Sequence, residues 1–288
     1  VHIPQATRTQ KPIYKGQNPL QGTYIRQYEG DYKCDEVAVN KMLAEKVEDS
    51  RDSKVLKNFG FDDIDISTFY AYRNIFKSHK PDDARNALND IEFLKNIGAY
   101  KTDRESGITG LTVAGLLMFG KSICIEDALP NYNLDYQERP RAVTEQRWID
   151  RLTIDGSWSG NVFDFYRIVI NKLFANIKVP FKLEGDKRKD DTPVHHAIRE
   201  ALINTLVHAD FTDRLSVLIV KRPDMFGFRN PGNMRIPIEV AIKGGESDCR
   251  NRILQKMFML IGFSERAGSG IPNIFSGWSS QNWAKPLL

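Results

Sequence analysis

Residues 193–210, PVHHAIREALINTLVHAD, constrain the fold most strongly, because their pattern predicts a helix with two chemically different faces. Thr192 suits the N-cap position and Pro193 the first helical position. The face expected to be buried carries Ala197, Ala201, Leu202, Thr205 and Leu206. The other face carries polar residues one turn apart, His196, Glu200, Asn204 and His208. One side of this helix must therefore pack on an apolar layer, and the other must meet solvent or a ligand.

The sequence around this helix alternates between strand-like and helix-like segments. Strands are expected in the stretches NYNLDYQER, RWIDRLTID, RLSVLIVKRP and MFGFRN, and a second helix in NVFDFYRIVINKLFANI. This order predicts a mixed sheet with helices on one face for residues 131–288, which is a two-layer α/β sandwich within an α+β protein.

The region before residue 131 divides into two further parts. Residues 48–130 read as a mainly helical middle unit, and helices followed by short strands suit a winged-helix-like arrangement. Residues 1–47 predict a β-hairpin, with KPIYKG and GTYIRQY as its strands and QNPLQG as its turn, followed by the amphipathic helix DEVAVNKMLAEK. The chain starts at Val1 in strand-like sequence, so we expect a fragment of a longer protein, cut inside a domain.

Composition places the chain among folded cytoplasmic proteins. It has 288 residues, of which 41% are hydrophobic and 27% charged, and no apolar run long enough for a membrane span. Three widely spaced cysteines favour a reducing compartment, and no secretory leader is expected.

The formal net charge of +4 permits nucleic-acid binding, and the distribution of basic residues locates it. The first 26 residues hold no acidic residue and carry Arg8, Lys11, Lys15 and Arg26. These four side chains are candidates for contacts with DNA phosphates, which would make affinity depend on salt. The alternative is a hairpin whose basic side chains are simply solvated.

Residues 115–122, GLLMFGKS, match the phosphate-loop pattern G-x-x-x-x-G-K-[ST]. The four middle residues are large and apolar, and the preceding sequence has helical spacing. We therefore interpret the stretch as a helix that ends at Gly120, with a short strand or turn after it in SICIEDALP, and not as a phosphate loop. A nucleotide site must be sought elsewhere.

Three later features suit magnesium–nucleotide chemistry when taken in order. The amide oxygen of Asn204 can coordinate Mg²⁺, and Glu200 can orient or deprotonate a water. Asn230 ends a strand at a tight Asn-Pro-Gly turn, where it could bond a base edge. Gly268 and Gly270 precede a helix whose N-terminus could meet a phosphate. Each feature alone also has an ordinary structural explanation: a solvated helix face or common turn chemistry.

The ordered set resembles the ATP-binding Bergerat (GHKL) domain shared by gyrase, heat-shock chaperones, histidine kinases and MutL. More closely, HHAIREALINTLVHADF, FRNPGNM and RNRILQKMFMLIGFSERAGSGI are similar to the divergent version in RecG-related transcriptional regulators. In that family the domain follows an Alba-like, Schlafen-type DNA-binding domain, which KPIYKGQNPLQGTYIRQYEGDYKC resembles near its end. The stretch GLTVAGLLMFGKS is similar to the middle segment of the same family.

The resemblance implies a role for each matching residue. Glu200 corresponds to the catalytic, water-activating glutamate, and Asn204 to the Mg²⁺ ligand. Asn230 stands where the superfamily has the aspartate that reads adenine. The other implied nucleotide-binding positions are His208, Gly232, Gly268, Ser269 and Gly270. Asn230 lacks the carboxylate charge and only Gly232 remains of the D-x-G-x-G spacing, so binding is expected more than efficient hydrolysis.

The resemblance implies a DNA-associated transcriptional regulator that binds ATP and Mg²⁺. An ATPase that remodels DNA or a protein partner, slow at most, is the first alternative. A non-catalytic dimerisation scaffold, and hence a homodimer, is the second. DNA contact is expected mainly through a missing N-terminal part.

The resemblance also implies a lid over the nucleotide. Gly244 and Gly245 suit a hinge, and Ser247 or Asp248 suits the N-cap of a helix whose basic side chains could close onto phosphate. Those basic side chains are Arg250, Arg252 and Lys256. The alternative is that the apolar residues of this helix anchor it in the core and its basic face meets water.

Overall fold

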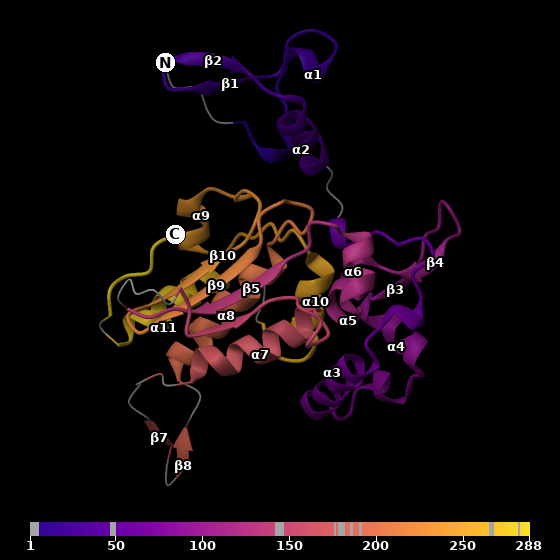
Figure 1. Ribbon diagram of the computed structural model, residues 1–288, viewed down its shortest axis with the longest axis vertical. Coiled ribbons are helices and arrows are strands. Elements are labelled where there is room, and N and C mark those ends of the chain that lie inside the picture. Colours follow the sequence, from indigo (N-terminus) through magenta and orange to yellow (C-terminus); the bar gives the residue numbers. More distant parts are fainter. Residues whose placement is uncertain are drawn as a thin grey trace. The chain divides into compact units, whose positions relative to one another are not determined.

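The computed structural model describes residues 6–46, 50–141, 147–175, 177, 182–184, 187–189, 192–264, 268–281 and 283–288. The chain forms two compact units, Val1–Asp49 and Ser50–Leu288 (Figure 1). The linker residues 47–49 and the segment 265–267 before Gly268 lie outside the described residues.

The first unit contains a hairpin and a helix, but the hairpin uses a later segment than expected. Its elements are η1 (Arg8–Gln10), α1 (Pro19–Gly22), β1 (Tyr24–Gln27), β2 (Gly30–Lys33) and α2 (Glu36–Lys46). β1 pairs antiparallel with β2. The two segments expected to form the hairpin meet at an isolated bridge between Tyr14 and Thr23. The reason is local: the Asn18 side chain caps the one-turn helix α1, which takes the place of the expected turn.

The second unit starts with a mainly helical part. Its elements are η2 (Arg51–Ser53), η3 (Phe61–Asp63), α3 (Ile66–His79), η4 (Ala84–Ala87), α4 (Asp90–Ile97), β3 (Tyr100–Thr102), β4 (Thr109–Leu111), α5 (Val113–Phe119) and α6 (Ser122–Ala128). Asp65, Asn89 and Thr112 cap α3, α4 and α5 by accepting a backbone N–H. An aromatic cluster fills the space between these helices, with Phe119 packed edge-on against Phe69 and Tyr72.

The structure confirms the helix that ends at Gly120 and corrects the expectation for the next segment. The N–H of Leu116 donates to the carbonyl of Thr112, and the N–H of Gly120 to that of Leu116, so these donors cannot curl around a phosphate. The segment expected as a strand or turn is the helix α6. Ile125 is buried in α6 while Ile123 is 73% exposed, so the apolar residues of this short segment do not mark one helical face.

A four-stranded mixed sheet organises the rest of the unit. Its strands are β5 (Leu134–Glu138), β6 (Asp150–Leu152), β9 (Val217–Arg222) and β10 (Met225–Arg229), in the order β10-β9-β5-β6. The β5–β9 pair is parallel, and the other two pairs are antiparallel. A separate two-stranded sheet joins β7 (Lys182–Glu184) to β8 (Lys187–Lys189).

Helices cover one face of this sheet. They are α7 (Val162–Phe174), α8 (Pro193–Val207) and α11 (Gly270–Ser279), and the connecting helices are α9 (Ile238–Lys243) and α10 (Arg252–Leu260). Tyr136 of β5 and Ile219 of β9 are fully buried in the hydrophobic core that the sheet shares with α7 and α8, and Figure 1 shows these two helices beside the sheet. This arrangement confirms the α+β fold. One hydrophobic core runs from Ile64 to Ile261, so the predicted division at residue 130, which stays a prediction, falls within it.

Within the described ranges, no helix combines the length and apolar character needed to cross a membrane.

Candidate functional site

Helix α8 positions the polar residues singled out in the sequence. Thr192 is the N-cap and forms a capping box with His195, and Pro193 occupies the first turn. The expected apolar face is turned inward, with Leu202 and Leu206 fully buried. The helix packs across the sheet against β9 and β10, so its polar side chains are held on a rigid element.

Glu200 and Asn204 meet the N-terminus of α11. A β-carbon added at Gly270 would come within 2.5 Å of both Oε1 of Glu200 and Nδ2 of Asn204. Further along, a β-carbon at Gly277 would lie 2.4 Å from the carbonyl oxygen of Pro193. The two helices therefore run antiparallel in close contact, and only glycine at position 270 leaves room for the carboxylate and the amide.

Gly268 precedes this helix in a left-handed conformation, with φ of 93°, which favours glycine. Its carbonyl accepts a hydrogen bond of 2.9 Å from the N–H of Gly245. The paired glycines of the expected lid therefore rest against the glycine segment at the start of α11.

A second cluster surrounds Arg250, one turn beyond Asn204 along α8. The Arg250 guanidinium donates to the carbonyl oxygens of His208 (2.6 Å) and Asn233 (3.2 Å). Gly232 packs against the Arg250 guanidinium, since a β-carbon added at Gly232 would sit 2.4 Å from Nη1 of Arg250. Burial, and to a smaller extent the charges of Arg250 and Arg235, lowers the pKa of His208 to about 4, so this imidazole is neutral at pH 7.

Arg250 and the helix start differ from the sequence prediction. Arg250 is only 2% exposed and lies before α10, whose N-cap is Asn251 and not Ser247 or Asp248. The Arg250 side chain donates hydrogen bonds to backbone carbonyls. Arg252 is exposed and pairs with Asp248 at 3.7 Å. The sequence could not predict the burial of Arg250, because the carbonyls that accept its hydrogen bonds lie 17 and 42 residues away along the chain.

Asn230 is half-buried at the end of β10, beside this second cluster. The next residue, Pro231, accepts a hydrogen bond of 2.9 Å from the N–H of Asp210. The Asn-Pro-Gly turn is thus tied to the chain just after α8. Glu200, Asn204 and Gly270 form one cluster, and His208, Gly232 and Arg250 form the other. Their nearest members along α8, Asn204 and His208, are about 6 Å apart along the helix axis by its rise per residue.

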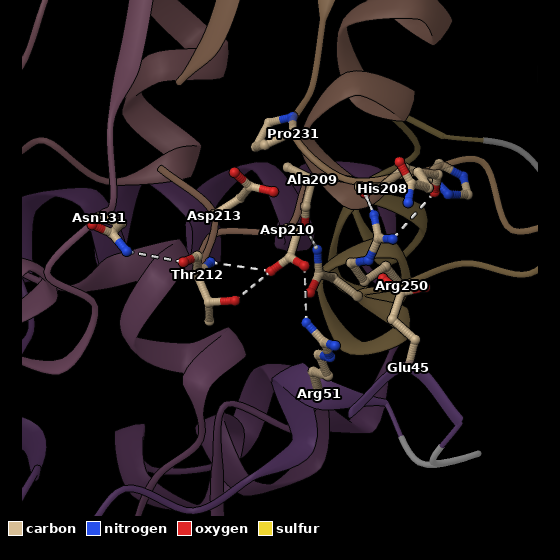
Figure 2. Close-up of polar contacts among 12 residues, drawn as sticks. Glu45, Arg51, Asn131, His208, Ala209, Asp210, Thr212, Asp213, Pro231 and Arg250 are labelled. Carbon is tan, nitrogen blue, oxygen red and sulfur yellow. Dashed lines mark hydrogen bonds and ion pairs between the residues drawn. The ribbon is translucent and has the colours of Figure 1, made fainter. Parts of the chain in front are cut away.

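A polar clamp formed by residues 50–52 was not predicted from the sequence. The Asp52 carboxylate, fully buried, accepts the N–H groups of Ile253 and Leu254 at 2.9 Å and so caps α10. Arg51 pairs with Asp210 at 2.9 Å (Figure 2). Burial is the largest influence on Asp52 and raises its pKa. The stretch Ser50-Arg51-Asp52 has the composition of a cap, but its partners lie about 200 residues further along the chain.

The four basic candidates of the first unit are partly engaged. Arg8 donates to the carbonyl of Glu45, and Arg26 forms an exposed ion pair with Asp31 at 3.2 Å. Lys15 is exposed, and Lys11 is half-buried.

Comparisons with known proteins relate two segments of the chain to described families. Residues 216–288 match the family described as "Putative ATP-dependent DNA helicase recG C-terminal", and residues 40–135 match a domain of unknown function, DUF8451. A search of curated proteins gives no significant match.

One solved structure is similar to the chain in fold. The crystal structure of the DIP2311 protein from Corynebacterium diphtheriae aligns with a TM-score of 0.59 and 17% identity, covering 92% of this chain and 50% of that one. The chain thus spans about half the length of that protein, and likeness at this identity shows the fold alone. The C-terminal match relates residues 216–288 to an ATPase-related, RecG C-terminal-like family.

Proposed function

We propose that residues 131–288 bind a magnesium–nucleotide at the junction of α8 and α11. The observation that carries this proposal is the close approach of Glu200 and Asn204 to the backbone of Gly270. A carboxylate, an amide oxygen and a helix N-terminus without a side chain in the way are the groups that a Mg²⁺–phosphate pair requires. The match of residues 216–288 to an ATPase-related family supports the same chemistry.

The residues present fit Mg²⁺ as a partner of phosphate and not as an ion held by protein alone. Among the described residues, no three His, Cys, Asp or Glu side chains gather into a metal site. Mg²⁺ commonly takes one or two protein ligands and completes its shell with phosphate oxygens and waters. Asn204 would supply the protein ligand, and the N–H groups of Gly270 and Ile271, which lack intrahelical acceptors, would face the phosphates.

Glu200 is the candidate base for hydrolysis. It is 9% exposed and lies at the same junction, where it can orient a water toward a phosphate. Asn230 would meet the base from the end of β10, where an amide replaces the aspartate that the Bergerat resemblance implies. We propose that nucleotide binding regulates the protein and that turnover is slow.

The first unit would provide contact with DNA in a transcriptional regulator of this kind. Its support is charge: Arg8, Lys11, Lys15 and Arg26 stand in a stretch with no acidic residue. Affinity for duplex DNA should fall steeply as salt rises.

Calorimetry with ATP and Mg²⁺ tests the nucleotide site. Asn204→Ala should weaken Mg-ATP binding at least tenfold, because the metal loses its protein ligand. Asn171→Ala is the matched control, since Asn171 is an exposed asparagine on α7 that donates to the carbonyl of Arg167. Equal affinities for the two variants would reject the site.

Turnover measurements separate an ATPase from a binding domain. Glu200→Gln should retain Mg-ATP binding and abolish any phosphate release. A wild-type chain that binds no nucleotide at millimolar concentration would leave the dimerisation scaffold as the function.

A further inference from the structure

The four-stranded sheet has a second face, opposite α7 and α8. The register of the strands places side chains on it unambiguously: Asp135 lies opposite Leu218, and Leu218 opposite Arg229. Successive residues of a strand point to opposite faces, so this face alternates with the one formed by Tyr136 and Ile219. Asp135 and Gln137 at the centre of this face are buried, at 8% exposure each, whereas Met225 is 43% exposed.

Four arginines lie across this face. Arg151 of β6 lies opposite Gln137, Arg222 of β9 opposite Met225, and Arg229 of β10 opposite Leu218. Arg139 follows β5 and donates to Gln137, which places it on the same face. We call Arg139, Arg151, Arg222 and Arg229 the arginine face.

The charge of this face is unbalanced. Among its described residues the two carboxylates are Asp135, which is buried under the bidentate contact of Arg151, and Asp224, which pairs with Arg222. Arg139 and Arg229 instead bond neutral acceptors, Gln137 and Ser216. Four guanidinium groups against these two carboxylates give a positive surface whose side chains are already held in place.

An aromatic ring borders the same surface. The guanidinium of Arg151 lies 4.6 Å from the ring centroid of Trp148, and that residue is 36% exposed. The neighbouring Ile149 is 58% exposed. Exposed rings beside arginines give nucleobases a stacking platform and phosphates a set of donors.

From this combination we infer that the arginine face binds the backbone of a single-stranded nucleic acid. Guanidinium forks match phosphate oxygens, and charge complementarity favours a polyanion over a neutral partner. The four strands span about 14 Å at their usual spacing, so a short stretch of chain crosses the whole face. An unpaired strand is favoured over a duplex because only its bases are free to stack on Trp148. The arginine face shares no residue with the proposed nucleotide site or with the basic set Arg8, Lys11, Lys15 and Arg26.

Fluorescence anisotropy with a labelled 20-nucleotide oligothymidine, in the full chain and without Mg²⁺, tests the inference. Arg222→Gln combined with Arg229→Gln should weaken binding at least tenfold at low salt. The slope of log affinity against log salt should fall by about 1.4, as expected for two lost phosphate contacts on a single strand. The matched control is Lys101→Gln combined with Arg104→Gln, which removes the same charge from exposed positions near β3 and should retain both values.

Three outcomes would overturn the inference. One is a wild-type chain that does not bind the oligonucleotide at low salt. Another is an equal loss of affinity in the variant and the control. The third is a change of molecular mass by light scattering in Arg222→Glu combined with Arg229→Glu, with oligonucleotide affinity unchanged, which would assign the face to a protein partner.

Discussion

The aromatic cluster between α3 and α5 and the polar junction at the end of α8 are held together by opposite means. In the cluster, Phe69, Tyr72 and Phe119 are fully buried and pack edge to face. At the junction, Arg250 and Asp52 are as deeply buried but bond to backbone carbonyls and N–H groups. The first region derives its stability from apolar area, which tolerates small shifts, and the second from hydrogen bonds, which do not.

This difference also separates their roles. The rings of Phe69 and Phe119 offer a phosphate neither a charge nor a hydrogen-bond donor. The junction joins the end of α8, the Asn-Pro-Gly turn and the start of α10, and it lies one turn from Asn204. The polar cluster around Arg250 and Asp52 therefore sets the geometry of the proposed nucleotide site, while the aromatic cluster supports the scaffold. Variants in each region test that contrast.

The largest effect is expected in the aromatic cluster. Phe119→Ala should lower the free energy of unfolding by about 3–5 kcal/mol, because it removes a fully buried ring and leaves a cavity. Phe119→Leu, which fills part of the space, should cost about 1–2 kcal/mol. Urea unfolding measures both; a loss below about 1 kcal/mol for the alanine variant would show that the cluster is not a major source of stability.

The next effect is a pH dependence from His208. Its pKa is lowered to about 4 in the folded chain, so the unfolded chain binds more protons between pH 4 and pH 6.5. The contribution of His208 to the free energy of unfolding amounts to about 3 kcal/mol. It is complete above pH 6.5 and is lost as pH falls toward 4. The stability difference between wild type and His208→Gln should therefore shrink as pH falls through this range. A difference independent of pH would contradict the burial of a neutral imidazole.

A smaller loss is expected from the clamp. Asp52→Ala removes the acceptor of the N–H groups of Ile253 and Leu254 and should cost about 2 kcal/mol. Asp52→Asn keeps a carbonyl oxygen in the same place and should cost less than about 1 kcal/mol. Thermal unfolding of the two variants at pH 7 makes the comparison, and equal losses would mean that the cap is not what Asp52 provides.

The smallest effect belongs to the exposed hairpin of the first unit. Arg26→Gln breaks an ion pair with Asp31 in which both side chains are 66% exposed, so unfolding should change by less than about 0.5 kcal/mol. The same variant should weaken DNA binding if Arg26 contacts phosphate. A change in the free energy of unfolding without a change in DNA affinity would contradict the proposed contact of Arg26 with DNA phosphate and give it a structural role.

Local pattern was enough to predict several elements. The two faces of α8, its start at Thr192 and the helix that ends at Gly120 all follow from spacing within one element. The approach of Gly270 to Glu200 and Asn204 was not predictable from spacing; the sequence grouped these residues by their chemistry and order, and the family resemblance then assigned their roles.

Contacts between distant segments could not be predicted. Asp52 caps a helix that starts 200 residues later, and the buried position of Arg250 depends on carbonyls of His208 and Asn233. The hairpin shift arose because a side-chain cap at Asn18 competed with the strand pattern. A single chain's pattern cannot weigh such competition.

Hydrogen exchange with and without Mg-ATP is the decisive measurement for the nucleotide site, because it locates a ligand on the backbone. We expect new protection at residues 268–273, where α11 begins, and at 240–252, whose glycine pair contacts Gly268. The β3–β4 hairpin should show no change and serves as the internal control. Proven Mg-ATP binding with unchanged exchange at 268–273 would contradict a nucleotide site at the α8–α11 junction.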